Sequence, residues 1–360
     1  MPQHTHWGGS RLSFNCPKSD RTERPILYNV GWSACAGRNL RGVVVMSEAF
    51  WKHPRSSEAL VRQWERKTSR WASVPFLLEE VHRRMLGRAE IMRPVDGGVL
   101  VQGWMHKETL QPLQALFAGR SIHLLSPAAW PSGWSNMEQP HAQSISGKFK
   151  SFLSKVLANT DTGPGGSENG FKPMYSPVEH LLALPGCDIA LPDSSQSLVW
   201  SPLWLHQVNE PTQLMAQWHR VLKPDGGVFF SCFGPDTAKE LHGFASALGQ
   251  HLPDFSDMHD LGDALSRQGF SDPVMEMEKL TLTYADPRKM IAEWRQLNAN
   301  LLADRKPGLS GKSALAKAYE NLAKDLPEGA DRYHLTLELV YGHAWKVKKN
   351  QSPQIATVSL

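Results

Sequence analysis

One stretch, residues 197–240, constrains the fold of this chain more than any other. It begins with a short apolar run at Leu198–Trp200 and continues with a helical pattern at 214–222, where apolar residues recur every three or four positions. Pro224–Gly227 then ends the helix, and a second apolar run follows at Val228–Phe230. Strand and helix signals that alternate in this way are typical of an α/β sheet with crossover helices. We therefore expect an α/β fold.

The composition narrows the class of protein. Apolar residues make up 41% and charged residues 21% of the 360 residues, which is typical of a soluble globular protein. No apolar run reaches the roughly 18 residues that a membrane span needs, so we expect no membrane partner. Cys16, Cys35, Cys187 and Cys232 have neither C-x-x-C nor zinc-site spacing, which favours free thiols in the reducing cytoplasm. We expect no bound metal, because His, Asp and Glu show no ligand spacing.

The net charge of +4 resides in the first part of the chain. Residues 1–45 hold six Lys or Arg and two Asp or Glu, and the remainder holds 33 of each sign. The rest of the chain is therefore neutral, and we expect no nucleic-acid partner. We interpret residues 1–55 as a disordered extension, a transit peptide or sequence translated ahead of a start at Met46, and 56–347 as one domain. Within this domain 130–180 is expected to be a flexible insertion, and 348–360 a tail.

Several sequence runs then identify a family. They are Arg220-Val-Leu-Lys-Pro-Asp-Gly-Gly227, Phe233-Gly-Pro-Asp-Thr237, Phe255-Ser-Asp-Met-His-Asp-Leu-Gly-Asp263, Thr281-Leu-Thr-Tyr-Ala-Asp-Pro287 and Val340-Tyr-Gly-His-Ala-Trp345. With them the chain resembles the malonyl-acyl-carrier-protein O-methyltransferases of biotin synthesis, closely over 187–347 and less so over 60–128. The resemblance implies a class I methyltransferase fold. This is a doubly wound, mostly parallel seven-stranded sheet with an antiparallel last strand, and its cofactor is S-adenosylmethionine.

The cofactor motif of such enzymes, V-L-D-L-G-x-G-x-G, aligns with Val99–Lys107. Gly103 matches a glycine, and glycine lets the backbone approach a ligand closely. Val101 stands where the motif has an acid, and Met105 stands where it has a second glycine. At the end of the second expected strand, residues 125–126 replace the acid that accepts hydrogen bonds from the ribose. These departures weaken the expected cofactor site.

Two interpretations of the departures remain open. In the first, Trp104 stacks on the adenine and Gln102 makes the hydroxyl contacts. In the second, Trp104 and Met105 fill the old pocket. Asp188 has a spacing that resembles the family's third-strand acid, although a loop aspartate capping a turn fits equally. The residues that we expect at the cofactor are Gln102, Gly103, Trp104, Asp188 and Ser201.

The family's reaction methylates the free carboxylate of a malonyl thioester. A carboxylate is already ionised at neutral pH, so the reaction needs hydrogen-bond donors rather than a strong base. His206, His259, Tyr341 and His343 lie in the resembling motifs and are the predicted catalytic residues, with a structural role as the alternative for each. An acidic carrier protein also needs a basic docking surface. The candidates, which a solvated basic face would equally explain, are Arg288, Lys289, Arg295, Arg305 and Lys306.

Two functions remain open from the sequence. One is a monomeric S-adenosylmethionine-dependent methyltransferase whose partner is an acyl-carrier protein carrying a malonyl group. The other is a non-catalytic protein of the same fold that binds or assembles other proteins and has lost the cofactor. The motifs after residue 187 favour the first function, and the departures in 99–107 and 125–126 favour the second.

Overall fold

The computed structural model describes residues 50–68, 76–89, 95–103, 105, 107–127, 178–182, 188–297, 302–303, 311–324, 326, 329 and 331–348. The predicted extension up to residue 49, most of the predicted insertion at 130–180 and the end of the predicted tail lie outside these residues. So do Trp104, Arg305 and Lys306, which the sequence had singled out.

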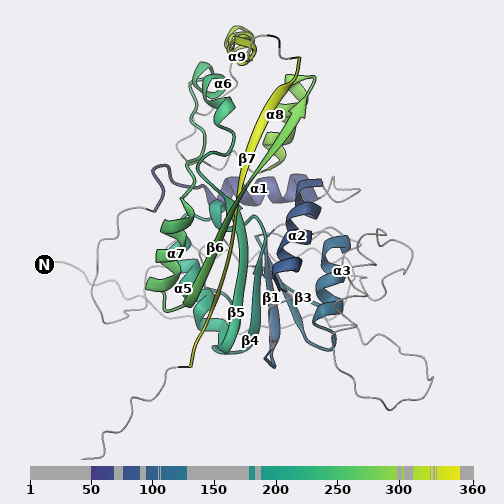
Figure 1. The fold of residues 1–360 in the computed structure, drawn as a ribbon, viewed down its shortest axis with the longest axis vertical. Coiled ribbons are helices and arrows are strands. Elements are labelled where there is room, and N and C mark those ends of the chain that lie inside the picture. The colour runs from purple at the N-terminus through teal and green to yellow at the C-terminus, as the bar shows by residue number, and fades with distance from the viewer. Residues whose placement is uncertain are drawn as a thin grey trace, which may run out of the picture. The chain divides into compact units, whose positions relative to one another are not determined.

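Seven strands form one sheet (Figure 1): β1 (Gly98–Gln102), β2 (Ile122–Ser126), β3 (Val178–Leu182), β4 (Gln196–Ser201), β5 (Leu222–Phe233), β6 (Ser271–Tyr284) and β7 (Tyr333–Trp345). Their order is β3-β2-β1-β4-β5-β7-β6. The strands β1 to β5 pair in parallel, whereas β7 runs antiparallel to both of its neighbours, β5 and β6. The structure confirms the predicted doubly wound, mostly parallel sheet with an antiparallel last strand.

The described helices are α1 (Ser57–Thr68), α2 (Phe76–Ala89), α3 (Lys107–Leu116), α5 (Pro211–Val221), α6 (His242–Ala247), α7 (Met258–Arg267), α8 (Pro287–Gln296) and α9 (Lys312–Lys324), with short 3-10 turns η1 (Leu205–Gln207) and η2 (Lys239–Leu241). The start of α8 is fixed by an aspartate cap and a proline. The Asp286 carboxylate accepts a hydrogen bond from the Arg288 amide at 2.8 Å, and Pro287 occupies the first turn. None of the described helices is long and apolar enough to cross a membrane.

Apolar residues on both faces of the sheet explain why its inner strands are apolar at consecutive positions. In β4, Leu198 and Trp200 belong to the core that contains residues of α2 and α3, whereas Val199 belongs to the core that contains α1, α5 and α7. Side chains alternate between the two faces of a strand, so a strand covered on both faces must be apolar throughout. The apolar runs at Leu198–Trp200 and Val228–Phe230 therefore form strands inside the sheet.

The strands β6 and β7 extend beyond the parallel part of the sheet. Pairing of β5 with β7 ends at Phe233 and Leu339, while pairing of β6 with β7 continues to Tyr284 and Tyr333. The projecting ends lead to α8 and α9, and α9 packs against α6 (Figure 1). Elements from the last third of the chain thus lie beyond the carboxyl end of β5.

One predicted boundary needs correction. The domain begins before residue 56, because the Trp51 indole is buried and donates to the Val208 carbonyl at 2.8 Å. The prediction missed this segment because single aromatic and basic residues carry no periodic signal. At the end of the expected insertion, which was placed at about 130–180, β3 starts at Val178 and pairs in parallel with β2.

Candidate active site

The carboxyl ends of β1 and β4 form the topological switch point of the sheet. The chain moves from β1 outward to β2 and β3, then returns to β4 on the other side of β1. In open α/β sheets, ligands bind outside the carboxyl ends of the strands at this point. The residues that border it are Gly103 after β1 and the turn 201–204 after β4.

The backbone of Gly103 passes very close to the turn after β4. Its φ is +133°, and a Cβ there would lie 2.4 Å from the Pro202 carbonyl oxygen, so only glycine fits. Across the turn, Leu203 has a φ of 47°, which is uncommon for a residue with a side chain. The Leu203 amide donates to Ser231 Oγ of β5 at 3.0 Å and so holds this conformation. Three strands thus fix the turn at the switch point.

The stretch 201–206 contains buried polar atoms that have no hydrogen-bond partner among the described residues. These atoms are Ser201 Oγ, Trp204 Nε1 and His206 Nε2. Most buried polar groups in folded proteins are hydrogen-bonded, so each exception needs an explanation. Three such atoms in six consecutive residues at the expected ligand-binding edge point to a ligand that carries acceptor atoms.

The His206 side chain is a neutral hydrogen-bond donor. Burial, together with the nearby Arg55 charge, lowers the pKa of His206 to about 3, so its imidazole is uncharged near pH 7. The Phe233 amide donates to His206 Nδ1 at 3.4 Å, which makes this nitrogen the acceptor. The ring proton must then sit on Nε2, the atom without a partner. The ring is held in place by Phe233 at 4.6 Å and Phe255 at 5.7 Å between centroids.

A buried arginine that the sequence did not single out lies beside His206. The Arg55 side chain is 1% exposed, and its Nε donates to the His206 carbonyl at 3.2 Å. Its Nη1 contacts Asp254 Oδ1 at 3.2 Å. Asp254 also accepts from the amides of Lys52 at 2.7 Å and His53 at 3.3 Å. Burial opposes ionisation of Asp254, but the Lys52 amide and the Arg55 guanidinium outweigh it and lower the pKa of this carboxyl.

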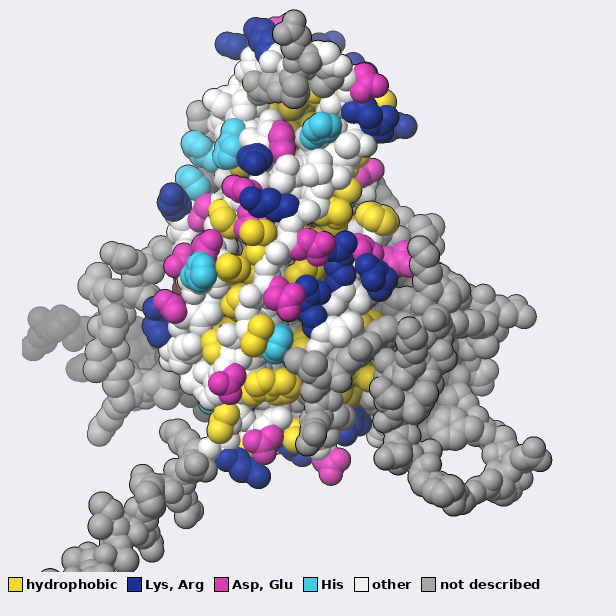
Figure 2. Space-filling model, in the orientation of Figure 1, with side chains coloured by type: hydrophobic (Ala, Val, Ile, Leu, Met, Phe, Trp, Pro, Cys, Tyr) yellow, Lys and Arg dark blue, Asp and Glu magenta, His cyan; other side chains and the backbone are white. Residues whose placement is uncertain are grey.

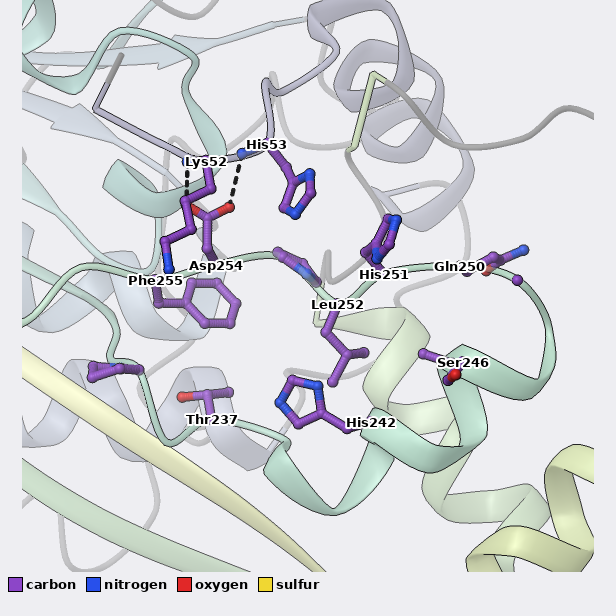
Figure 3. Close-up of a pocket in the computed structure, with 14 residues that line it drawn as sticks. Lys52, His53, Thr237, His242, Ser246, Gln250, His251, Leu252, Asp254 and Phe255 are labelled. Atoms are coloured by element: carbon purple, nitrogen blue, oxygen red, sulfur yellow. Dashed lines mark hydrogen bonds between the residues drawn. The ribbon is translucent and has the colours of Figure 1, made fainter. Parts of the chain in front are cut away.

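Phe255, whose ring contacts His206, also lines a cavity of about 680 Å³. Its wall is formed by residues 52–53, by the segment 235–237 after β5, by α6 and by residues 249–255. Figure 3 shows His53, His242 and His251 around it, with Lys52 and Asp254 on one side. The His53 and His251 rings stack, with centroids 5.0 Å apart. Apart from the F-x-D-M motif that contains Phe255, no sequence pattern indicates this cavity.

The Phe233-Gly-Pro-Asp motif has a structural role at this edge of the sheet, where it packs against Glu338 of β7. A Cβ on Gly234 would lie 2.5 Å from Glu338 Oε1, so the glycine makes room for this buried carboxylate of β7. The Asp236 amide donates to Glu338 Oε2 at 3.0 Å, and Thr237 Oγ1 donates to the Glu338 carbonyl at 3.1 Å. The motif therefore fixes the path of the chain from β5 to α6, along the wall of the cavity.

The structure does not gather the four predicted catalytic residues into one hydrogen-bonded cluster. Tyr341 and His343 lie on β7, paired with Ser231 and Phe229, and their side chains contact other groups. The Arg88 guanidinium lies 4.2 Å from the centroid of the Tyr341 ring, and His343 stacks on Phe229 at 5.2 Å. Burial raises the pKa of Tyr341 to about 12 and lowers the pKa of His343.

His259 and the predicted cofactor residues are more dispersed still. His259 is exposed in the first turn of α7, and Asp188 is exposed in a loop. Gln102 Oε1 accepts from Trp218 Nε1 at 2.8 Å, so this side chain links β1 to α5. Among the described members of the cofactor set, Gly103 and Ser201 lie at the switch point.

The residues that replace the expected acids and glycine are part of the core. Val101 and Met105 are buried in the cluster that includes α2 and α3, and Met105 is fully buried. Leu125 belongs to the other core, and Ser126 is buried at the end of β2. Met105 thus packs into the core, whereas Trp104, on which both interpretations of the motif depend, lies outside the described residues. Elsewhere in the described parts, no group of three His, Cys, Asp or Glu could hold a metal ion.

Comparison with known proteins agrees with this geometry. A family model described as "Methyltransferase domain" matches residues 171–230. The malonyl-[acyl-carrier protein] O-methyltransferase of Gallionella capsiferriformans (strain ES-2) is 34% identical over 294 residues, which is 80% of this chain and 90% of that protein. The proteins of the same name from Laribacter hongkongensis (strain HLHK9) and Nitrosospira multiformis are each 42% identical over 164 residues. These two matches span 54% and 52% of the relatives' lengths.

The match to the Gallionella protein covers 80% of the chain, and the sheet has the parallel strands and the antiparallel last strand that the resemblance implied. The chain belongs to the malonyl-[acyl-carrier protein] O-methyltransferase family.

Proposed function

We propose that this protein transfers a methyl group to the free carboxylate of a malonyl thioester carried by an acyl-carrier protein, in biotin synthesis. The observation that supports it best is the neutral His206 Nε2–H donor, buried without a partner among the described residues at the carboxyl edge of the sheet. A carboxylate oxygen of the acceptor is the kind of atom that such a donor binds. The names of the family relatives give the acceptor.

The reaction places few acid–base demands on the protein. The acceptor carboxylate is ionised near pH 7, and one of its oxygens is already the nucleophile. A His206 side chain with a pKa of about 3 neither donates nor removes a proton at this pH. It therefore orients the carboxylate through one oxygen and leaves the other oxygen free to attack. Alignment and exclusion of water supply the rest of the rate enhancement.

S-adenosylmethionine is the cofactor that the methyltransferase-domain match supports. When bound, it supplies an electrophilic methyl group. Gly103 fits this group by its place, because it follows β1 at the switch point where such cofactors bind, and its close packing against the Pro202 carbonyl leaves room only for glycine. Ser201 Oγ, buried without a partner in the described part, is a second contact for it. At the end of β2, Ser126 stands in place of a carboxylate, so we expect weaker binding there by about 1.5–3 kcal/mol.

The helix α8 is the proposed docking site for the acidic carrier. Arg288, Lys289 and Arg295 are exposed on it, and Lys and Arg side chains lie over the region of α8 and α9 in Figure 2. The alternative of a non-catalytic binding or assembly protein has no support from the comparisons, in which the matched relatives carry the name of a methyltransferase. A monomer in the cytoplasm remains our expectation from the sequence.

The test is methyl transfer to the carrier itself. Purified protein, labelled S-adenosylmethionine and malonyl-acyl-carrier protein are mixed, and the carrier is analysed by mass spectrometry. We expect methyl transfer by the unaltered protein and a rate about 100-fold lower for His206→Phe, which keeps the ring but removes the donor. His334→Phe, an exposed histidine on β7, is the matched control. Binding of both reactants without transfer by the unaltered protein would refute the proposal.

A further inference from the structure

The cavity behind Phe255 carries an excess of cationic and donor groups. Its lining includes Lys52 and three histidines, His53, His242 and His251. Asp254 is the one acidic residue that lines it, and this carboxylate is already engaged by Arg55 and by two backbone amides. Lys52, His242 and His251 have exposed side chains and reach the cavity from three separate segments (Figure 3). Such a lining favours an anionic ligand.

The neighbours of the cavity indicate which part of a ligand it can hold. On one side, Phe255 separates it from His206, with ring centroids 5.7 Å apart. Gln250, His251 and Leu252 of its wall also line a smaller cavity of about 40 Å³ whose wall includes Arg295 of α8. The large cavity therefore has wall residues in contact with His206, which carries the unpartnered donor, and wall residues in common with the cavity beside the basic helix. A ligand that joins these two places must be long and must pass through it.

We propose that this cavity binds the 4′-phosphopantetheine arm of the carrier, with the phosphate of the arm held by Lys52, His242 and His251. The inference rests on the proposed function, because only a carrier-bound thioester brings such an arm. A volume of about 680 Å³ is in the range of small-molecule sites. The two anions of the substrate then have separate partners. The malonyl carboxylate meets neutral donors near His206, and the phosphate meets cationic and imidazole donors on the side of α8.

The experiment compares two ligands that differ only in the phosphate. Titration calorimetry on the full chain measures the affinities of 4′-phosphopantetheine and of pantetheine, neither of which can be methylated. We expect 4′-phosphopantetheine to bind at least tenfold more tightly, the effect of one charge-assisted hydrogen bond. Lys52→Met and His242→Ala should each reduce this preference severalfold and leave the affinity for pantetheine unchanged.

Two controls keep the interpretation specific. Lys348→Met removes an exposed cation that pairs with Asp225 near the start of β5, away from the cavity, and should leave the preference intact. Thermal unfolding of each variant checks its fold, and the exposed positions of Lys52 and His242 make misfolding a minor concern. Equal affinities for the two ligands, or equal losses in Lys52→Met and Lys348→Met, would overturn the phosphate site.

The result is separable from the test of the proposed function. A phosphate preference that depends on Lys52 and His242, in a protein that methylates no malonyl carrier, would support the site and end the proposed reaction. Methyl transfer with no phosphate preference would end the site and leave the reaction in place.

Discussion

A neutral, buried His206 should make the stability of the protein depend on pH in a way that the His206→Phe variant loses. The pKa of this imidazole is lowered from 6.5 to about 3 in the folded protein. The unfolded chain therefore binds a proton below pH 6.5 that the folded chain does not bind until about pH 3. The stability that comes from keeping the ring neutral is fully present above pH 6.5 and is lost as the pH falls toward 3.

The size of the effect follows from the two pKa values. Between pH 7 and pH 5, proton uptake by His206 in the unfolded state lowers the free energy of unfolding by about 2 kcal/mol. Phenylalanine does not titrate, so His206→Phe should lose about 2 kcal/mol less than the unaltered protein over this interval. Phenylalanine also cannot accept the Phe233 amide hydrogen bond, which costs about 1 kcal/mol at both pH values and cancels from the difference.

Urea unfolding at pH 7 and pH 5 measures this difference. The free energies are extrapolated to water for the unaltered protein, for His206→Phe and for the control His334→Gln, whose histidine is exposed. We expect the control to keep the pH dependence of the unaltered protein. If His206→Phe keeps it as well, then His206 is protonated in the folded state at pH 5, and the assignment of its Nε2–H as a neutral donor fails.

Three further perturbations have outcomes that the geometry fixes. Gly103→Ala places a Cβ 2.4 Å from the Pro202 carbonyl oxygen and must displace the turn after β4, so we expect a lower melting temperature and no detectable heat on titration with S-adenosylmethionine. Normal values for both would contradict the close packing at the switch point. Tyr341→Phe removes a hydroxyl that is buried without a described partner, so we expect the free energy of unfolding to rise by about 1 kcal/mol. A lower free energy of unfolding, measured with urea, would mean that the hydroxyl is hydrogen-bonded. Arg55→Met leaves the partly exposed Asp254 without its cation and should lower the free energy of unfolding by about 2–4 kcal/mol, or the melting temperature by roughly 4–12 °C. An unchanged free energy of unfolding would show that the ion pair is unimportant.

The sequence predicted the sheet well because its pattern has one physical cause. Strands covered on both faces, such as Leu198–Trp200, must be apolar at every position, and the amphipathic helix after them must end before the next strand. Beyond the end of β6, the aspartate cap and the proline at Asp286-Pro287 begin α8 through local chemistry in the same way. A short edge strand such as β3 has too few apolar positions to show this pattern, and its first residues fall within the expected insertion.

The site was less predictable because its groups act through burial rather than through spacing. His206 was among the predicted residues, but its neutral tautomer depends on the Phe233 amide and on Arg55, and neither contact is visible in a sequence pattern. Tyr341 and His343 are predicted to be catalytic because they lie in the family run 340–345. In the structure, Tyr341 contacts Arg88 and His343 stacks on Phe229. A motif identifies positions, whereas the role of each position depends on what packs against it.

Arg55 connects the two halves of the proposed substrate site. Its guanidinium holds the His206 carbonyl on one side and Asp254 on the other, and its own amide donates to Asn209 Oδ1 at 3.0 Å. Asp254 in turn fixes the amides of Lys52 and His53, which line the cavity. A displacement at Arg55 therefore moves the donor for the carboxylate and the cation for the phosphate together. Arg55 is thus a positioning residue, and Arg55→Met should weaken 4′-phosphopantetheine binding as well as methyl transfer, whereas His206→Phe should affect transfer alone.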